Sequence, residues 1–138
     1  MDERESIRIA KASFDRCNAL SEFPATFYPR FFAACPDARP YFAKTDFDRQ
    51  VKLLRNAIGL LLIAPFFSTE ADAAPTLLSK MAERHSRRHL NIEPRFYPPF
   101  VDSLLETVKE VDPEYSPTVE AAWRAAITKG VAYMQAHY

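Results

Sequence analysis

One histidine stands out among the residues whose types and spacing could do chemistry. In LLSKMAERHSRRHL, residues 77–90, the side chains of Leu78, Met81 and His85 recur at three and four residues and so share one helix face. An imidazole on such a face is either a structural residue or a metal ligand, and spacing alone leaves both alternatives open. His89 lies four residues further and could share a zinc ion, but no third or fourth nitrogen or sulfur ligand is nearby in sequence.

The elements that must position His85 are predicted to be helices. The sequence has two glycines and eleven prolines, whereas tight hairpins draw heavily on glycine. Between the prolines, apolar residues recur at three and four positions, as in Ile7, Ala10, Phe14, Cys17 and Leu20. This pattern predicts an all-α single domain over 1–138. Its helices are expected near residues 7–20, 21–35, 46–64, 77–90, 97–111 and 116–138, with a corner at 36–47 and a loop at 66–75.

Composition narrows the classes of partner. Lys plus Arg and Asp plus Glu both number 18, so no net charge attracts nucleic acid or anionic lipid. The longest apolar run, residues 57–67, contains Pro65 and is shorter than the roughly 20 residues of a membrane-spanning helix. MDERESIRIA is too charged for a secretory signal, so we expect a cytoplasmic protein in which Cys17 and Cys35 are buried thiols. No Gly-rich phosphate loop, CxxC, HExxH or serine elbow is present.

Several stretches taken in order are similar to a known family. They are FYPRFFAACPDARPYF, DRQVKLLRNAI, KMAERHSRRHL, EPRFYPPFVDSLLETV and EAAWRAAI. Together they resemble the bacterial single-domain globins and the globin part of flavohaemoglobins, over nearly the whole chain. The resemblance implies a globin fold, with six to eight helices around a pocket that holds haem b and its iron.

The resemblance also implies a role for individual residues. His85 matches the proximal histidine that ligates the haem iron, and Phe42 matches the phenylalanine that wedges against the ring. Tyr28 and Gln50 match the distal tyrosine and glutamine that face a bound gas, with Leu54 as their apolar neighbour. The other residues expected to contact the haem are Ile58, Met81, Tyr97, Phe100 and Leu104.

Physical reasoning agrees with these roles. An imidazole that ligates iron donates its other N–H to an acceptor, here expected to be a backbone carbonyl near Met81. Bound dioxygen acquires negative charge, so hydrogen bonds from the Tyr28 hydroxyl and the Gln50 amide would each stabilise it by about 1.5–3 kcal/mol. Without the resemblance to globins, Tyr28 would be interpreted as an ordinary half-buried tyrosine and Gln50 as an exposed helix residue.

The sequence departs from the family at three places. Pro29 directly follows Tyr28 and is expected to kink the second helix, because proline lacks a backbone donor. The segment between His85 and EPRFY has two more residues than in flavohaemoglobins. Tyr97 matches a proximal tyrosine, but the place of its glutamate partner falls at about Tyr138, so we expect that pairing to be absent or altered.

Four functions follow from this pattern. The first is a haem globin that reversibly binds dioxygen or nitric oxide, and also carbon monoxide. The second is a nitric oxide dioxygenase that forms nitrate with electrons from a separate reductase, so enzymatic activity stays open. The third is a gas sensor that acts through a protein partner, using an exposed apolar patch. The fourth is a globin-like interaction protein without haem, which His85 and Phe42 together argue against.

Overall fold

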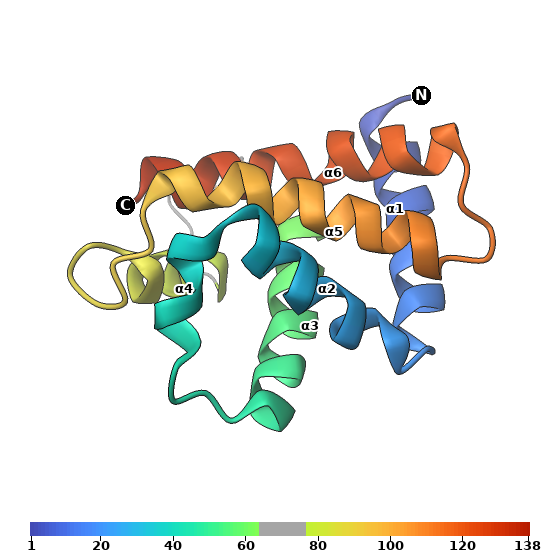
Figure 1. The fold of residues 1–138 in the computed structure, drawn as a ribbon. Coiled ribbons are helices and arrows are strands. Elements are labelled where there is room, and N and C mark those ends of the chain that lie inside the picture. The colour runs from blue at the N-terminus through green and yellow to red at the C-terminus, as the bar shows by residue number, and fades with distance from the viewer. Residues whose placement is uncertain (64–76) are drawn as a thin grey trace.

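The computed structural model describes residues 1–63 and 77–138, which form six α-helices and two 3₁₀-helices (Figure 1). The elements in chain order are α1 (Glu3–Asn18), α2 (Glu22–Ala34), η1 (Pro36–Phe42), α3 (Phe47–Ile63), α4 (Leu77–His85), η3 (Pro94–Phe96), α5 (Tyr97–Val111) and α6 (Pro117–Ala136). The predicted all-α class is confirmed. The expected loop at residues 66–75, and the expected helix end at residue 64, lie outside the described residues.

Short polar side chains begin three of these helices. Asp2 and Ser116 each accept a hydrogen bond from the backbone N–H three residues downstream, at 2.8 and 3.2 Å. Asp46 accepts from two backbone N–H groups in the first turn of α3, at 3.1 and 3.4 Å. These bonds satisfy N–H groups that have no partner inside the helix. The helix expected near residues 46–64 is therefore capped by Asp46.

The structure corrects one local expectation and adds detail to two others. The helix expected over residues 77–90 ends at His85, because the amides of the following turn bond back to the last carbonyls of α4. The corner expected at residues 36–47 contains a 3₁₀-helix, η1, with a proline at its start. Pro29 lies inside α2, which extends on both sides of it, and the expected kink stays a prediction.

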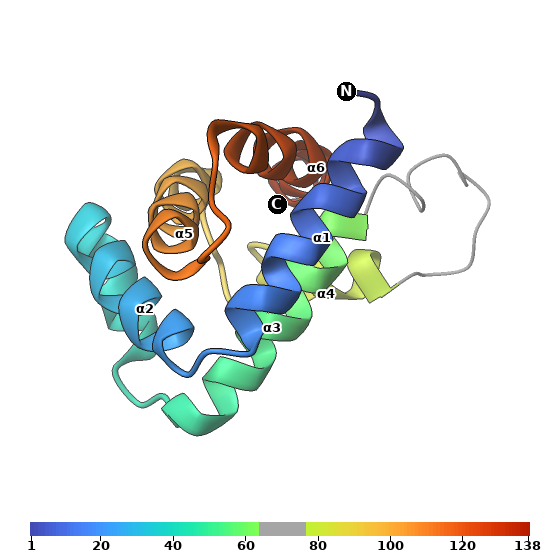
Figure 2. The same ribbon diagram turned by 90° about the vertical axis from the view of Figure 1, so that its right-hand side faces the viewer.

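The helices pack around one apolar core. α1 and α3 both pack on α6, and α2 packs on α5; Figure 2 shows α1 and α3 beside each other. Trp123, Phe23 and Phe27 are among the largest fully buried side chains. At the crossing of α3 and α6, a Cβ atom on Gly130 would lie 2.8 Å from the backbone oxygen of Leu61. The close approach of these two helices therefore depends on glycine at position 130.

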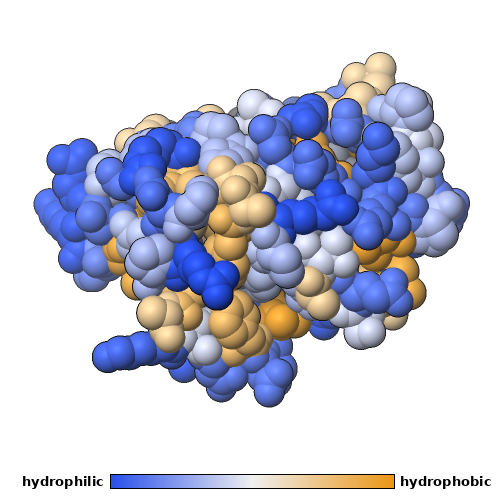
Figure 3. Space-filling view, in the orientation of Figure 1, coloured by the Kyte–Doolittle hydropathy of each residue, from blue (hydrophilic) through white to orange (hydrophobic). Residues whose placement is uncertain are grey.

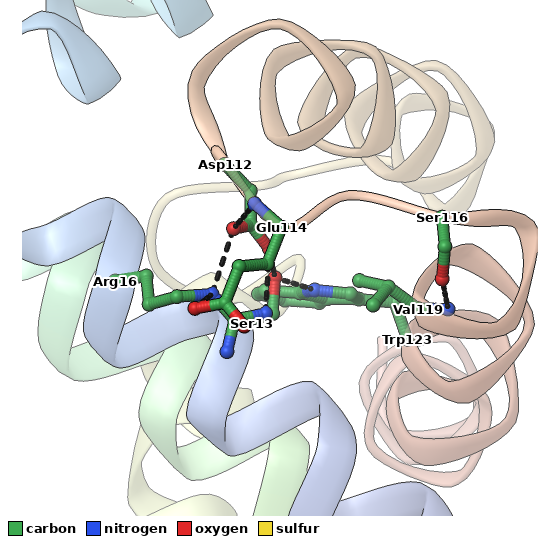
Figure 4. A network of polar contacts seen from close by, with 7 residues as sticks. All are labelled: Ser13, Arg16, Asp112, Glu114, Ser116, Val119 and Trp123. Carbon is green, nitrogen blue, oxygen red and sulfur yellow. Dashed lines mark hydrogen bonds and ion pairs between the residues drawn. The ribbon is translucent and has the colours of Figure 1, made fainter.

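A buried polar network joins α1 to the corner between α5 and α6 (Figure 4). The Asp112 carboxylate accepts from Arg16 Nε at 2.7 Å and from the Ser13 hydroxyl at 2.6 Å. Trp123 Nε1 in turn donates to the Ser13 oxygen at 2.9 Å. Burial alone would raise the pKa of Asp112, but the hydrogen bonds from Arg16 and Ser13 outweigh it and lower this pKa below its usual value. The network thus favours a charged, fully bonded carboxylate in the interior.

The surface is mixed in character. In the face drawn in Figure 3, hydrophilic residues surround several separate apolar areas. Within the described residues, no helix has the length and apolar character needed to cross a membrane. These observations agree with the equal numbers of acidic and basic residues in the sequence.

Candidate functional site

His85 is the last residue of α4 and its imidazole is half-buried. Its Nδ1 atom lies 2.7 Å from the carbonyl oxygen of Met81, one turn earlier, as expected from the sequence. Because a carbonyl can only accept, this contact places the ring proton on Nδ1 and leaves the Nε2 lone pair available. Burial lowers the pKa of His85; the Met81 carbonyl opposes this shift, and the Arg84 charge adds to it. The imidazole is therefore held neutral and in one tautomer.

The other two histidines lie in different surroundings. His89 is exposed, and its Nε2 atom lies 3.3 Å from a carboxylate oxygen of Glu83. His137 is exposed and stacks on Tyr133, with ring centroids 3.9 Å apart. Among the described residues, no group of three or more His, Cys, Asp and Glu side chains is placed to hold a metal ion. The zinc alternative for His85 and His89 thus finds no further ligand in that part of the chain.

Tyr28, on α2, carries a hydroxyl that lacks a partner. The residue is 6% exposed, and its buried oxygen makes no hydrogen bond to any described residue. Burial raises the pKa of Tyr28 to about 12, and the nearby side chain of Gln50 partly offsets that rise. Gln50 is half-buried on α3, but no hydrogen bond of ordinary geometry joins it to Tyr28. A buried hydroxyl costs about 1–3 kcal/mol when unpaired, so this pair of donors has capacity for an additional acceptor.

Aromatic rings connect Tyr28 to other residues expected at the site. Its ring centroid lies 5.8 Å from that of Phe42, at the end of η1, and 5.1 Å from that of Phe27. Phe27 in turn contacts Phe100 of α5 at 5.3 Å. Phe47, the first residue of α3, packs on Tyr28 at 5.6 Å although it is 43% exposed. The elements α2, η1 and α3 therefore meet at Tyr28, and α5 connects to it through Phe27.

The remaining apolar residues expected to contact a haem belong to the same core. Leu54, Ile58 and Leu104 are 5%, 0% and 0% exposed, and Phe42, Met81 and Phe100 are half-buried against them. Tyr97 is buried at the start of α5, and burial raises its pKa to about 12. The structure thus brings these residues into, or against, one apolar cluster.

The residues present fit a haem group. A neutral imidazole with an available Nε2 atom is the donor that a haem iron takes from histidine. The Tyr28 hydroxyl is a hydrogen-bond donor without an acceptor. The half-buried side chains of Phe42, Met81 and Phe100 have exposed apolar surface that a flat ring could cover.

Sequence reasoning missed the residues that hold the segment after His85. Asn91 lies there with a φ of 54°, in the left-handed region that asparagine tolerates better than most residues. Its backbone oxygen accepts a hydrogen bond from the Tyr41 hydroxyl at 2.9 Å, and its side chain accepts one from the Tyr138 hydroxyl. The signal in the sequence was an asparagine shortly after a helix end. Phe47 was missed as well, because a single aromatic at a helix start carries no such signal.

Comparison with known proteins adds three findings. The sequence matches the family described as Globin over residues 25–134. The crystal structure of PA3967 from Pseudomonas aeruginosa PAO1, described as structurally highly homologous to a human haemoglobin, is similar to this chain with a TM-score of 0.84. The two chains are 31% identical, and the match covers 96% of this chain and 98% of PA3967. No protein with a curated function matches the sequence.

Proposed function

Because the chain belongs to the globin family, we propose that it binds haem b through His85 and reversibly binds dioxygen or nitric oxide. The observation that carries this proposal is the hydrogen bond between His85 Nδ1 and the Met81 carbonyl. That bond fixes the tautomer in which Nε2 is free to bind iron, and it makes the ring a better electron donor. When bound, the haem would supply an iron that can bind a diatomic gas.

Apolar side chains exclude water from this position. Phe42, Leu54 and Ile58 would contact the ring from η1 and α3, and Phe100 and Leu104 would contact it from α5. Phe42 and Phe100 are only half-buried, so a haem that covered their exposed apolar surface would replace water there, which is favourable in proportion to the area covered. Exclusion of water also slows oxidation of the iron and loss of the group.

Tyr28 and Gln50 supply the specificity for the ligand. The Tyr28 hydroxyl is buried and lacks an acceptor, so a gas that acquires negative charge would satisfy it without disrupting another bond. Each such hydrogen bond contributes about 1.5–3 kcal/mol, or roughly ten- to a hundredfold in the rate of ligand release. These hydrogen bonds should slow the dissociation of dioxygen more than that of carbon monoxide, because bound carbon monoxide acquires less negative charge.

Two further activities would use the same residues. Dioxygenation of nitric oxide to nitrate consumes one dioxygen and one electron per nitric oxide, and the electron would come from a separate reductase. Gas sensing would instead pass the ligand state to a protein partner. The unpaired Tyr28 donor suits retention of dioxygen and therefore favours the dioxygenase over the sensor. A cytoplasmic location stays a prediction from the sequence.

The direct test is an absorption spectrum of the purified, haem-loaded protein, after dithionite and then after carbon monoxide. We expect a Soret band that shifts on reduction and shifts again with carbon monoxide. A protein that takes up no added haem would contradict the proposal. Consumption of nitric oxide by the reduced protein with a generic reductase and NADH would then separate the dioxygenase from a carrier.

A further inference from the structure

The segment that follows His85 is held from two distant parts of the chain. Residues 86–90 form a turn beside the end of α6, as both ribbon views show (Figures 1 and 2). The backbone N–H of Arg87 donates to the Tyr138 carbonyl at 3.0 Å, and the Arg87 guanidinium lies 4.8 Å from the centre of the Tyr138 ring. From the other side, the ring of Tyr41 packs on Phe96 at 5.6 Å.

Asn91 is the point at which the two sides meet. Its side-chain oxygen accepts from the Tyr138 hydroxyl, and its backbone oxygen accepts from the Tyr41 hydroxyl at 2.9 Å. One asparagine in the left-handed conformation, with φ at 54°, therefore binds two tyrosines from η1 and from beyond α6. We define this set, Tyr41, Asn91 and Tyr138, as the proximal latch.

The proximal latch acts on the end of α4 through backbone bonds. The N–H of Asn91 donates to the Ser86 carbonyl at 2.9 Å, and the N–H of Ile92 donates to the His85 carbonyl at 2.9 Å. The N–H of Leu90 donates to the Arg84 carbonyl at 3.0 Å. Carbonyls at a helix end have no partner within the helix, so their position depends on such bonds. A change at Asn91 is thus transmitted to the backbone of His85 itself.

From this geometry, and resting on the proposed function, we infer that Tyr138 and Tyr41 are positioning residues for the His85 imidazole. They fix the segment after His85 and thereby the position and orientation of Nε2, the atom that would bind a haem iron. The imidazole orientation has a second support in the Met81 carbonyl, so loss of one latch bond changes the orientation without releasing the ring. The iron–histidine bond should therefore respond to side chains that touch neither the haem nor the gas.

The test compares single substitutions in the haem-loaded, reduced protein by resonance Raman spectroscopy. Tyr138→Phe removes one hydroxyl but keeps the ring under Arg87, and Asn91→Gly removes the acceptor while glycine accepts the left-handed backbone. We expect both to shift and broaden the iron–histidine stretching band, and the double variant to show no further shift than Asn91→Gly. Tyr133→Phe is the matched control, because Tyr133 is on α6 but stacks on His137 instead.

A second readout uses the protein without haem. Loss of one hydrogen bond typically changes an opening equilibrium by about fivefold, so Tyr138→Phe should speed amide exchange at Arg87 and Ile92 by that factor. An iron–histidine band unchanged in fully loaded Tyr138→Phe would overturn the inference while leaving the proposed function intact. Wild-type protein that takes up no haem would overturn both.

Discussion

Replacement of Tyr28 by phenylalanine should stabilise the protein without haem and weaken the binding of dioxygen to the haem-loaded protein. In the protein without haem the hydroxyl is buried and unpaired, and such a group costs about 1–3 kcal/mol. Phenylalanine keeps the ring contacts with Phe27, Phe42 and Phe47 while removing the unpaired oxygen. We therefore expect the free energy of unfolding to rise by about 1 kcal/mol or more.

In the haem-loaded protein the same change removes a donor to the bound gas. A hydrogen bond to a charged acceptor contributes about 1.5–3 kcal/mol, so dioxygen should dissociate about ten- to a hundredfold faster. Carbon monoxide, which carries less charge, should dissociate with a smaller change. The two expectations are joined by one cause, because the hydroxyl that is unsatisfied without ligand is the one that the ligand satisfies.

Two assays measure these effects. Urea unfolding of the protein without haem gives the stability change, and displacement of dioxygen by carbon monoxide in a stopped-flow instrument gives the off-rate. Tyr115→Phe is the control. Tyr115 lies at the corner between α5 and α6, and its hydroxyl donates to the Glu120 carboxylate at 3.3 Å instead of lying near Tyr28. A Tyr28→Phe protein that is less stable and releases dioxygen at the wild-type rate would refute the reasoning.

Three further predictions concern the fold that positions the site. Gly130→Ala should destabilise the protein by about 1–3 kcal/mol, because the added methyl would meet the backbone of Leu61. Gly59→Ala should instead stabilise it by about 0.5–1 kcal/mol, because the nearest atom to the added methyl lies 3.8 Å away. Equal effects of the two substitutions in urea unfolding would contradict this. Asp112→Asn should cost about 1.5–3 kcal/mol, because it removes the charged acceptor of the Arg16 and Ser13 hydrogen bonds while Glu114 stays near Arg16, and a loss below 1 kcal/mol would count against the network. Because the pKa of Asp112 is lowered in the folded state, its contribution is complete above its usual pKa and is lost as pH falls through the lowered value; unfolding measured below about pH 5 should show this loss in wild type and not in Asp112→Asn.

Local patterns in the sequence predicted much of the fold. On the first helix, Ile7, Ala10, Phe14 and Cys17 are buried as their spacing indicated. These expectations succeeded because helical period and capping depend on residues within one or two turns. The all-α class therefore follows from the residues, and the globin family from the order of the motifs.

Other features depend on residues far apart in sequence and were not predicted. Ser13 and Asp112, which share a buried hydrogen bond, are separated by 99 positions, and neither carries a local signal for the other. The helix end at His85 depends on the turn that follows it, and that turn depends on Tyr138 from beyond the last helix. The bond between His85 and Met81 was predicted because it spans a single helical turn. Contacts within one or two helical turns could therefore be predicted from the sequence, whereas contacts between residues far apart in the sequence could not.

The central claim is that His85 is the protein ligand of a haem. The most direct measurement is a haem titration, followed by the Soret band, of wild-type protein, His85→Ala and His89→Ala. His89 is exposed four residues away and serves as the matched control. Wild type and His89→Ala should each bind one haem per chain, while His85→Ala should retain none after gel filtration. A His85→Ala protein that keeps a full complement of haem with the wild-type spectrum would contradict the account.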